Sequence, residues 1–152
     1  MKPWIKPLLL ASLVALEGCA SLAEPAGDWV DVPLAPNTWW QQGAGYREAQ
    51  YSIPLASGEA LEHKITMAEG AMVVYEWTTA LGEDALLTAE FHGHTERVGE
   101  APGTVMFYKI HEDGRESGAL RAPFEGIHGW YFHNQGDADI VVELRVAGFF
   151  SD

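Results

Sequence analysis

The amino-acid sequence predicts an all-β protein, a β-sandwich or jelly roll of about eight or nine short strands. Three observations favour this class. Apolar and polar residues alternate with a period of two in many short segments. Sixteen glycines and eight prolines supply turns between those segments. No segment after residue 19 repeats its apolar residues with the helical period of about 3.6.

The clearest strands lie in the last third of the chain. Every second residue from Ile140 to Val146 is a large aliphatic one, which indicates a strand with one buried face. Residues 127–133 are aromatic on both faces, which suits a strand covered on both sides. The turn-forming residues 134–137 separate the two runs. We therefore expect the runs to pair as a β-hairpin, with the rest of the domain packed against it.

Earlier segments show the same alternation. In residues 72–78, Val73, Tyr75 and Trp77 face one way, and in residues 85–94 the even-numbered residues face outward. The other candidate strands are residues 28–32, 48–55, 61–67, 104–110 and 116–124.

The charge balance limits the partners of this protein. Twenty-two acidic residues against nine basic ones give a net charge of −13. That excess argues against nucleic acid and against docking onto anionic lipid by surface charge. It favours cationic partners or metal ions, although it also serves solubility alone. A chain of 152 residues that is 47% hydrophobic is about one domain with a real core.

The first 18 residues predict a signal peptide that is not part of the fold. Two lysines precede an apolar stretch that is too short to span a bilayer, which takes about 20 residues. Leu16 to Cys19 resembles the lipobox of bacterial lipoproteins, with Glu17 as a departure from its usual small or apolar residue. The resemblance implies a lipid on Cys19 and, because Ala20 follows, sorting to the outer membrane of a Gram-negative host, facing the periplasm. The alternative is an ordinary signal peptide in which Cys19 is incidental.

Cys19 is the only cysteine of the chain. If a lipid occupies it, the mature domain has no thiol, which excludes disulfides, thiolate metal ligands and cysteine nucleophiles. We therefore divide the chain into a signal peptide (1–18), a tether (19–27) and a β-sandwich domain (28–152).

Three motifs carry a resemblance to known proteins: Val74-Tyr75-Glu76-Trp77, Phe91-His92-Gly93 and the run from Ala122 to Asn134. The stretch 70–150 that contains them resembles a bacterial family of envelope proteins known as transmembrane anchor proteins. More distantly, the closing run is similar to the last hairpin of GOLD-type β-sandwiches, which act as interaction modules. The resemblance implies a domain tethered outside the cytoplasm, by a membrane-spanning segment in the family and by a lipid here. Family members often lie beside heavy-metal efflux genes, which points to metal homeostasis.

The sharpest candidate site lies between Glu90 and His94. Residues two apart on a strand share a face, so Glu90, His92 and His94 project together. Two imidazoles and a carboxylate suit Cu²⁺ or Zn²⁺. We expect His128 to be the third imidazole, and Glu76 to lie on the polar face of a neighbouring strand. The structural alternative is an ordinary solvated strand face and a core histidine bonded to backbone.

A His-x-His pair in a jelly roll also suggests a cupin-like metalloenzyme. Cupins place a glycine six residues before the first histidine and a glutamate four or five after the second. Here Leu86 stands six before His92, and Glu96 and Glu100 stand two and six after His94. The sequence contains no Gly-x-Ser-x-Gly elbow and no phosphate-binding glycine loop. It therefore names no catalytic residue.

Three hypotheses follow from these observations. The first is a non-catalytic binding or accessory module tethered to the cell envelope, with a lipid in the membrane and an envelope protein as partner. The second is a Cu- or Zn-binding protein linked to metal homeostasis. A cupin-like metalloenzyme is the third and has the least support from the spacing.

Overall fold

The structure, a computed structural model, describes residues 31–100 and 103–152. The chain divides into two units, Met1–Thr38 and Trp39–Asp152. Every strand of the described part lies in the second unit, and the signal peptide, the tether and Cys19 lie outside the described residues.

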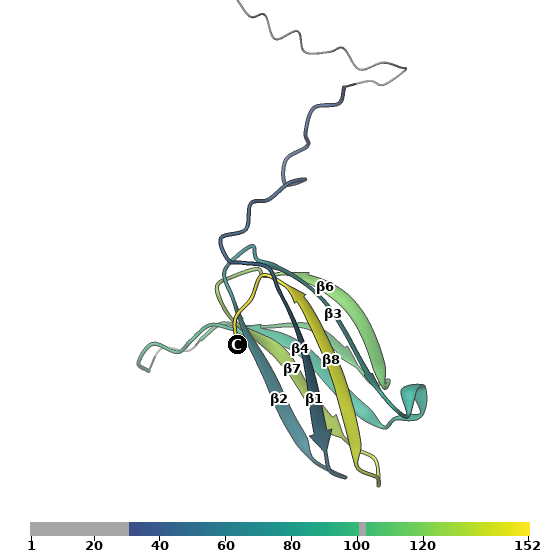
Figure 1. Cartoon of the computed structure of the whole chain (residues 1–152). Coiled ribbons are helices and arrows are strands. Elements are labelled where there is room, and N and C mark those ends of the chain that lie inside the picture. Colours follow the sequence, from purple (N-terminus) through teal and green to yellow (C-terminus); the bar gives the residue numbers. More distant parts are fainter. Residues whose placement is uncertain (1–30, 101–102) are drawn as a thin grey trace, which may run out of the picture. The chain divides into compact units, whose positions relative to one another are not determined.

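Eight strands form two four-stranded sheets within the described residues (Figure 1). Sheet A contains, in spatial order, β1 (Arg47–Leu55), β8 (Ile140–Gly148), β3 (Met72–Thr79) and β6 (Arg115–Arg121). Sheet B contains β2 (Ala60–Met67), β7 (Gly126–Asn134), β4 (Leu87–His94) and β5 (Val105–His111). All neighbouring strands are antiparallel. Two facing sheets of this kind, connected mainly by crossings between them, form a jelly roll, so the predicted fold class is confirmed.

The expected hairpin at the end of the chain is wrong. β7 lies in sheet B and β8 in sheet A, so the two strands do not pair. The turn between them crosses from one sheet to the other, and the buried side chain of Asn134 holds that crossing. Its Nδ2 donates to the carbonyls of Leu55, Ala56 and Ala138 at 2.8 to 3.2 Å, and its Oδ1 accepts from the Gly136 amide. Alternation shows which face of a strand is buried, but it does not show in which sheet the strand lies.

Most strand bounds agree with the sequence prediction to within two residues. The exceptions are the candidate strand 116–124, which ends three residues earlier at Arg121, and the candidate strand 28–32. Residues 31 and 32 are not in a strand, and residues 28–30 lie outside the described part. No α-helix occurs in the described residues, and a single turn of 3₁₀ helix spans Gly82–Asp84.

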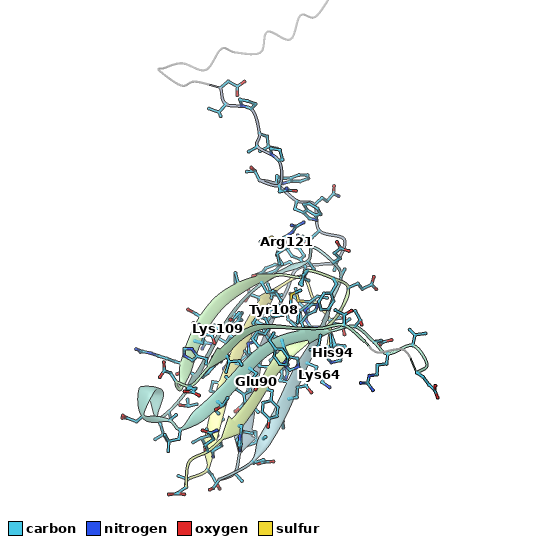
Figure 2. All side chains as sticks on the ribbon, turned by 180° about the vertical axis from the view of Figure 1, so that it is seen from behind. Lys64, Glu90, His94, Tyr108, Lys109 and Arg121 are labelled. Atoms are coloured by element: carbon cyan, nitrogen blue, oxygen red, sulfur yellow. The ribbon has the colours of Figure 1, made fainter. Side chains whose placement is uncertain are left out.

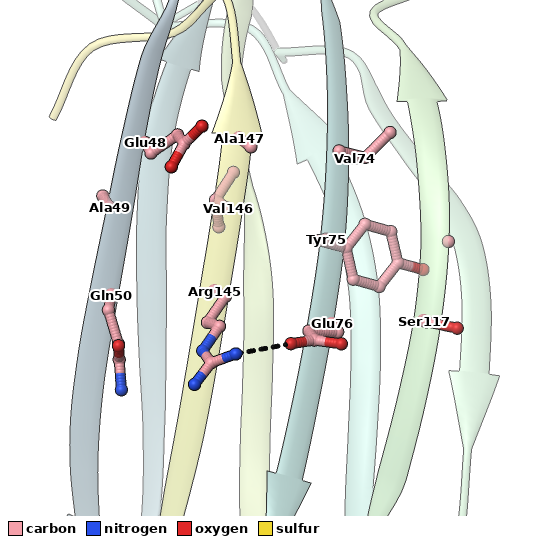
Figure 3. A pocket seen from close by; sticks show the side chains of 11 residues that line it. Glu48, Ala49, Gln50, Val74, Tyr75, Glu76, Ser117, Arg145, Val146 and Ala147 are labelled. Carbon is pink, nitrogen blue, oxygen red and sulfur yellow. Dashed lines mark hydrogen bonds and ion pairs between the residues drawn. The ribbon is translucent and has the colours of Figure 1, made fainter.

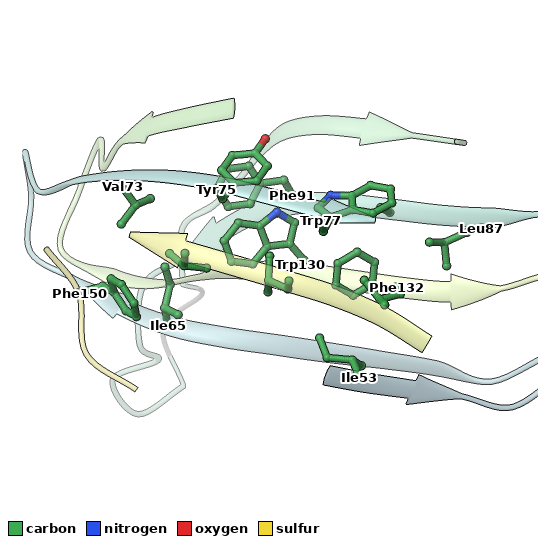
Figure 4. Packing of buried hydrophobic residues seen from close by; sticks show 14 of the residues in the cluster. Ile53, Ile65, Val73, Tyr75, Trp77, Leu87, Phe91, Trp130, Phe132 and Phe150 are labelled. Atoms are coloured by element: carbon green, nitrogen blue, oxygen red, sulfur yellow. The ribbon is translucent and has the colours of Figure 1, made fainter. Parts of the chain in front are cut away.

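The core between the sheets is built from aromatic rings (Figure 4). Phe91 of sheet B stacks on Trp130 with ring centroids 4.5 Å apart, and Tyr75 of sheet A meets both rings edge-on. Trp77 packs against Phe132 in the same way. Each such side chain contributes roughly 1.5–3 kcal/mol through burial. Large rings therefore occupy the space between the sheets, and the two outer faces remain available for ligands.

Candidate functional site

Glu90, His92 and His94 share the outer face of sheet B, as predicted. They are half-buried, whereas the residues between them, Phe91 and Gly93, are buried on the inner face. Figure 2 shows Glu90 and His94 on this side of the molecule. The two-residue period of β4 alone is enough to bring these three side chains together.

A carboxylate from a different strand joins His92. The Glu62 Oε1 atom lies 3.0 Å from His92 Nε2, and its Oε2 atom lies 3.0 Å from Lys64 Nζ. β7 runs between these strands, and Gly129 is the residue opposite both Lys64 and His92. Because Gly129 has no side chain, Glu62 reaches across β7 to the imidazole. Sequence reasoning did not identify Glu62, since strand order was unknown.

A β-bulge adds apolar side chains to the same face. The register of β4 with β5 shifts between Phe91 and His92, which leaves Tyr108 as the extra residue. Ile110 then stands opposite Glu90, Phe107 opposite His92, and Val105 opposite His94. Directly opposite residues project from the same face, so the bulge turns three large apolar residues outward. Their exposed fractions are 55% for Val105, 58% for Phe107 and 59% for Ile110.

Together these residues form one surface, which we call the sheet B face: Glu62, Glu90, His92, His94, Val105, Phe107, Ile110 and Tyr131. An open depression of about 850 Å³ covers most of it. The Phe107 ring lies 5.7 Å from the His92 ring, and the His94 ring lies 6.3 Å from the His92 ring. The Phe107 ring thus lies beside an imidazole that pairs with the Glu62 carboxylate.

The prediction that His128 completes this site is wrong. β7 directs His128 into the core, where it is fully buried. Its Nε2–H donates to the Phe124 carbonyl at 3.2 Å, so its Nδ1 accepts from the Tyr108 hydroxyl at 2.8 Å. Burial lowers the pKa of His128, a nearby His94 charge lowers it further, and the Phe124 carbonyl opposes that shift. Both nitrogens are occupied, which is the arrangement of a structural core histidine.

Gly93 explains how a histidine fits there. A Cβ atom at this position would lie 2.3 Å from the Tyr108 hydroxyl and 2.5 Å from His128 Nδ1. Glycine between the two outward histidines therefore makes room for a hydrogen bond on the inner face of the sheet.

Glu76 is also separate from the other candidates. β3 belongs to sheet A, and the Glu76 carboxylate lies on the outer face of that sheet, 3.1 Å from Arg145 Nη1 (Figure 3). It borders a second open groove, with Glu48, Val74 and Ser117. The five expected ligands therefore do not converge. Among the described residues, no group of three or more His, Cys, Asp or Glu side chains is arranged to hold a metal ion.

The cupin-like hypothesis needs the histidines inside an enclosed pocket. His92 and His94 instead lie on an open outer face, and their neighbour Phe91 fills the interior with Trp130. His92 and His94 therefore do not line the enclosed pocket that this hypothesis requires.

Sequence reasoning also missed the exposed apolar strand. Residues 104–110 form a nearly continuous apolar run, which is typical of a buried strand. The signal against burial was Lys109, because a lysine in such a run is a common feature of edge strands.

Comparisons with known proteins add little. No protein-family model and no curated protein matches the sequence. Among solved structures, the chain is similar to PliG of Aeromonas hydrophila, a periplasmic inhibitor of g-type lysozyme, at 12% identity and a TM-score of 0.41, over 72% of this chain and 91% of that one. It is also similar to a de novo designed double-stranded β-helix at 20% identity and a TM-score of 0.31, over 67% and 97%. These scores are too low to indicate what this chain binds.

Proposed function

We propose that this chain is a non-catalytic module of the cell envelope that binds another protein through the sheet B face. The observation that carries the proposal is the outward presentation of Val105, Phe107 and Ile110, each more than half exposed on one strand. A cluster of large apolar side chains in water is a common mark of an interaction surface.

The composition of the face fits protein recognition. Protein interfaces combine a central aromatic or aliphatic anchor with a polar rim. Phe107 supplies such an anchor, and Glu62 and Glu90 border it. Covering one large apolar side chain that is now half-exposed would contribute roughly half of 1.5–3 kcal/mol.

The histidines of the face do not contact a hydroxyl nucleophile within the described residues. His92 Nε2 meets only the Glu62 carboxylate, and His94 Nδ1–H donates to the backbone carbonyl of Thr95 at 3.2 Å. Within the described residues neither ring bonds a hydroxyl group. A nucleophile activated by an imidazole requires that contact.

The proposed location rests on the lipobox resemblance of Leu16 to Cys19 and on the single cysteine. No helix in the described part of the chain is long and apolar enough to cross a membrane. We expect Cys19→Ser to abolish labelling by radioactive palmitate and to release the chain from the membrane fraction. Unchanged labelling of that variant would refute the lipid anchor and leave the binding surface unaffected.

Site-specific photocrosslinking in intact bacteria tests the binding function. A photoreactive phenylalanine analogue replaces Phe107 in one variant and Val74, which is 57% exposed on sheet A, in a matched control. We expect a discrete protein adduct from position 107 and none from position 74. No adduct from position 107, or equal adducts from both positions, would contradict the proposal.

A further inference from the structure

The four strands at the edges of the sheets differ in how they are protected. Native edge strands avoid pairing with other chains through charges, prolines or a covering segment. β1 contains Pro54 near its end, and β6 carries Arg115 and Arg121 at its two ends. β2 displays Glu62 with Lys64, and a bridge from Ser151 to Thr66 covers part of its edge.

β5 lacks these forms of protection, apart from its bulge. It contains no acidic residue, although the chain has twenty-two. Its one charged residue, Lys109, is opposite the inward Phe91 and lies 3.3 Å from the nearly buried Glu116 carboxylate of sheet A. The half-exposed Lys109 ammonium is thereby engaged in an ion pair with the other sheet. Among the described strands, β5 is the edge on which pairing with another strand meets the least opposition.

We propose that β5 is a docking edge for an extended segment of a partner protein, which adds to sheet B as a further antiparallel or parallel strand and presents apolar and basic residues on the same outer face. This inference rests on the proposed function, because it names the partner of the same face. Strand addition supplies affinity through backbone hydrogen bonds and specificity through alternate side chains.

Geometry determines which side chains of the segment meet the apolar strip. An added strand lies about 4.8 Å from β5, and directly opposite side chains lie about 4.5–5.5 Å apart. Residues on the outer face of the segment therefore contact Val105, Phe107 and Ile110, while the residues between them face the other way. Apolar residues are therefore expected at alternate positions of the segment, where the side chains point to its outer face.

Charge determines the rest of the segment. Glu90 stands beside Ile110 on the outer face, and no ion pair or hydrogen bond engages its carboxylate within the described residues. Glu96 follows at the end of the same depression. A lysine or arginine of the segment would reach across β5 to these carboxylates. A second copy of this chain is a poorer occupant, because each copy carries a net charge of −13.

Selection from a displayed library tests this inference without knowledge of the partner. Random twelve-residue segments on phage are selected against the full chain in detergent. We expect enriched segments to carry apolar residues and a lysine or arginine at positions two apart, so that both kinds of side chain share one face. Segments without an excess of basic residues, or no enrichment at all, would overturn the proposal.

Variants and hydrogen exchange locate the bound segment. We expect Phe107→Lys to weaken the binding of a selected peptide at least about tenfold, and Glu90→Gln to weaken it about two- to threefold at low salt. The control Val74→Lys, on sheet A, should bind as the wild type does. Saturating peptide should slow exchange of the β5 backbone amides, which would enter a new ladder.

The outcomes also separate this inference from the proposed function. If peptides bind the sheet B face without slowing hydrogen exchange of the β5 amides, strand addition is refuted. A specific crosslink at position 107 would still support protein binding through this face. A dimer in analytical ultracentrifugation that Phe107→Lys dissociates would make a second copy the occupant and overturn the partner chemistry proposed here.

Discussion

At the scale of single residues, glycines determine where the neighbouring large side chains can lie. Gly93 lies between two outward histidines, and its missing Cβ leaves space on the inner face for Tyr108 and His128. Gly129 opens the outer face, so that Glu62 meets His92. The histidine pattern was visible in the sequence, whereas the role of each glycine depended on which strand lay beside it.

Gly93→Ala should destabilise the fold. The added methyl group would collide with the Tyr108 hydroxyl and with His128 Nδ1, and overpacking in a core costs about 1–3 kcal/mol. Urea denaturation measures the difference. Gly43→Ala is the matched control, because no atom lies within 4 Å of a Cβ built there. Equal midpoints for the two variants would contradict the proposed packing.

Stability should fall as the pH decreases from about 7 to 5. Burial lowers the pKa of His128 and of His63 below the ordinary histidine value of 6.5. The unfolded state therefore binds protons before the folded state does, so the stability is complete above about 6.5 and declines below it. Urea midpoints across this range and an NMR titration of both imidazoles check the prediction. A measured pKa above 6.5 for the His128 imidazole would contradict this prediction.

Cu²⁺ or Zn²⁺ binding by His92 and His94 stays a prediction. Calorimetry should show the same isotherm for the wild type and for Glu76→Gln, because Glu76 lies in the other sheet. The double variant His92→Ala/His94→Ala should lose the binding. If its isotherm is identical to that of the wild type, metal binding at these histidines is refuted.

At the scale of elements, β5 shows how one extra residue changes which side chains of a strand face outward. Without a bulge, residues 105, 107 and 109 would share a face, and Lys109 would lie among the apolar residues. With Tyr108 as the extra residue, Ile110 takes the outward place and Lys109 meets Glu116. Bulges redirect side chains in this manner. The apolar run that predicts a buried strand thus forms an exposed edge.

The double variant Phe107→Lys/Ile110→Lys should keep the stability of the wild type. Both side chains are more than half exposed, and substitutions at exposed positions usually change the free energy of unfolding by less than about 0.5 kcal/mol. Light scattering during heating should decrease, because lysines on an edge strand oppose association. A loss of more than about 2 kcal/mol would show that these residues are buried.

At the scale of the whole molecule, the core belongs to one jelly roll. All buried core residues lie between Ile53 and Phe150. The net charge of −13 disfavours self-association and nucleic acid, and it suits a cationic partner. The proposed tether would place the β5 edge within reach of other proteins of the envelope.

A chain that begins at Trp39 should fold and unfold as the full chain does. The compact unit that holds both sheets begins at that residue, and none of the removed residues that the structure describes, 31–38, belongs to the core cluster. Thermal denaturation measures the midpoint of unfolding. Near-ultraviolet circular dichroism follows it, because the buried tryptophans give rise to that signal. A clear decrease on truncation would assign part of the stability to residues 1–38.

Local alternation was sufficient to predict the all-β class, the inward and outward faces of residues 72–78, 85–94 and 140–146, and the shared face of Glu90, His92 and His94. Each of these depends on residues two apart, whose relation is fixed by the backbone of one strand. The sheet to which each strand belongs, the crossing at Asn134, the burial of His128 and the exposure of β5 depend on contacts between residues far apart in sequence. Those contacts arise when two apolar faces meet to form one core, and no single strand carries the information that decides its partner.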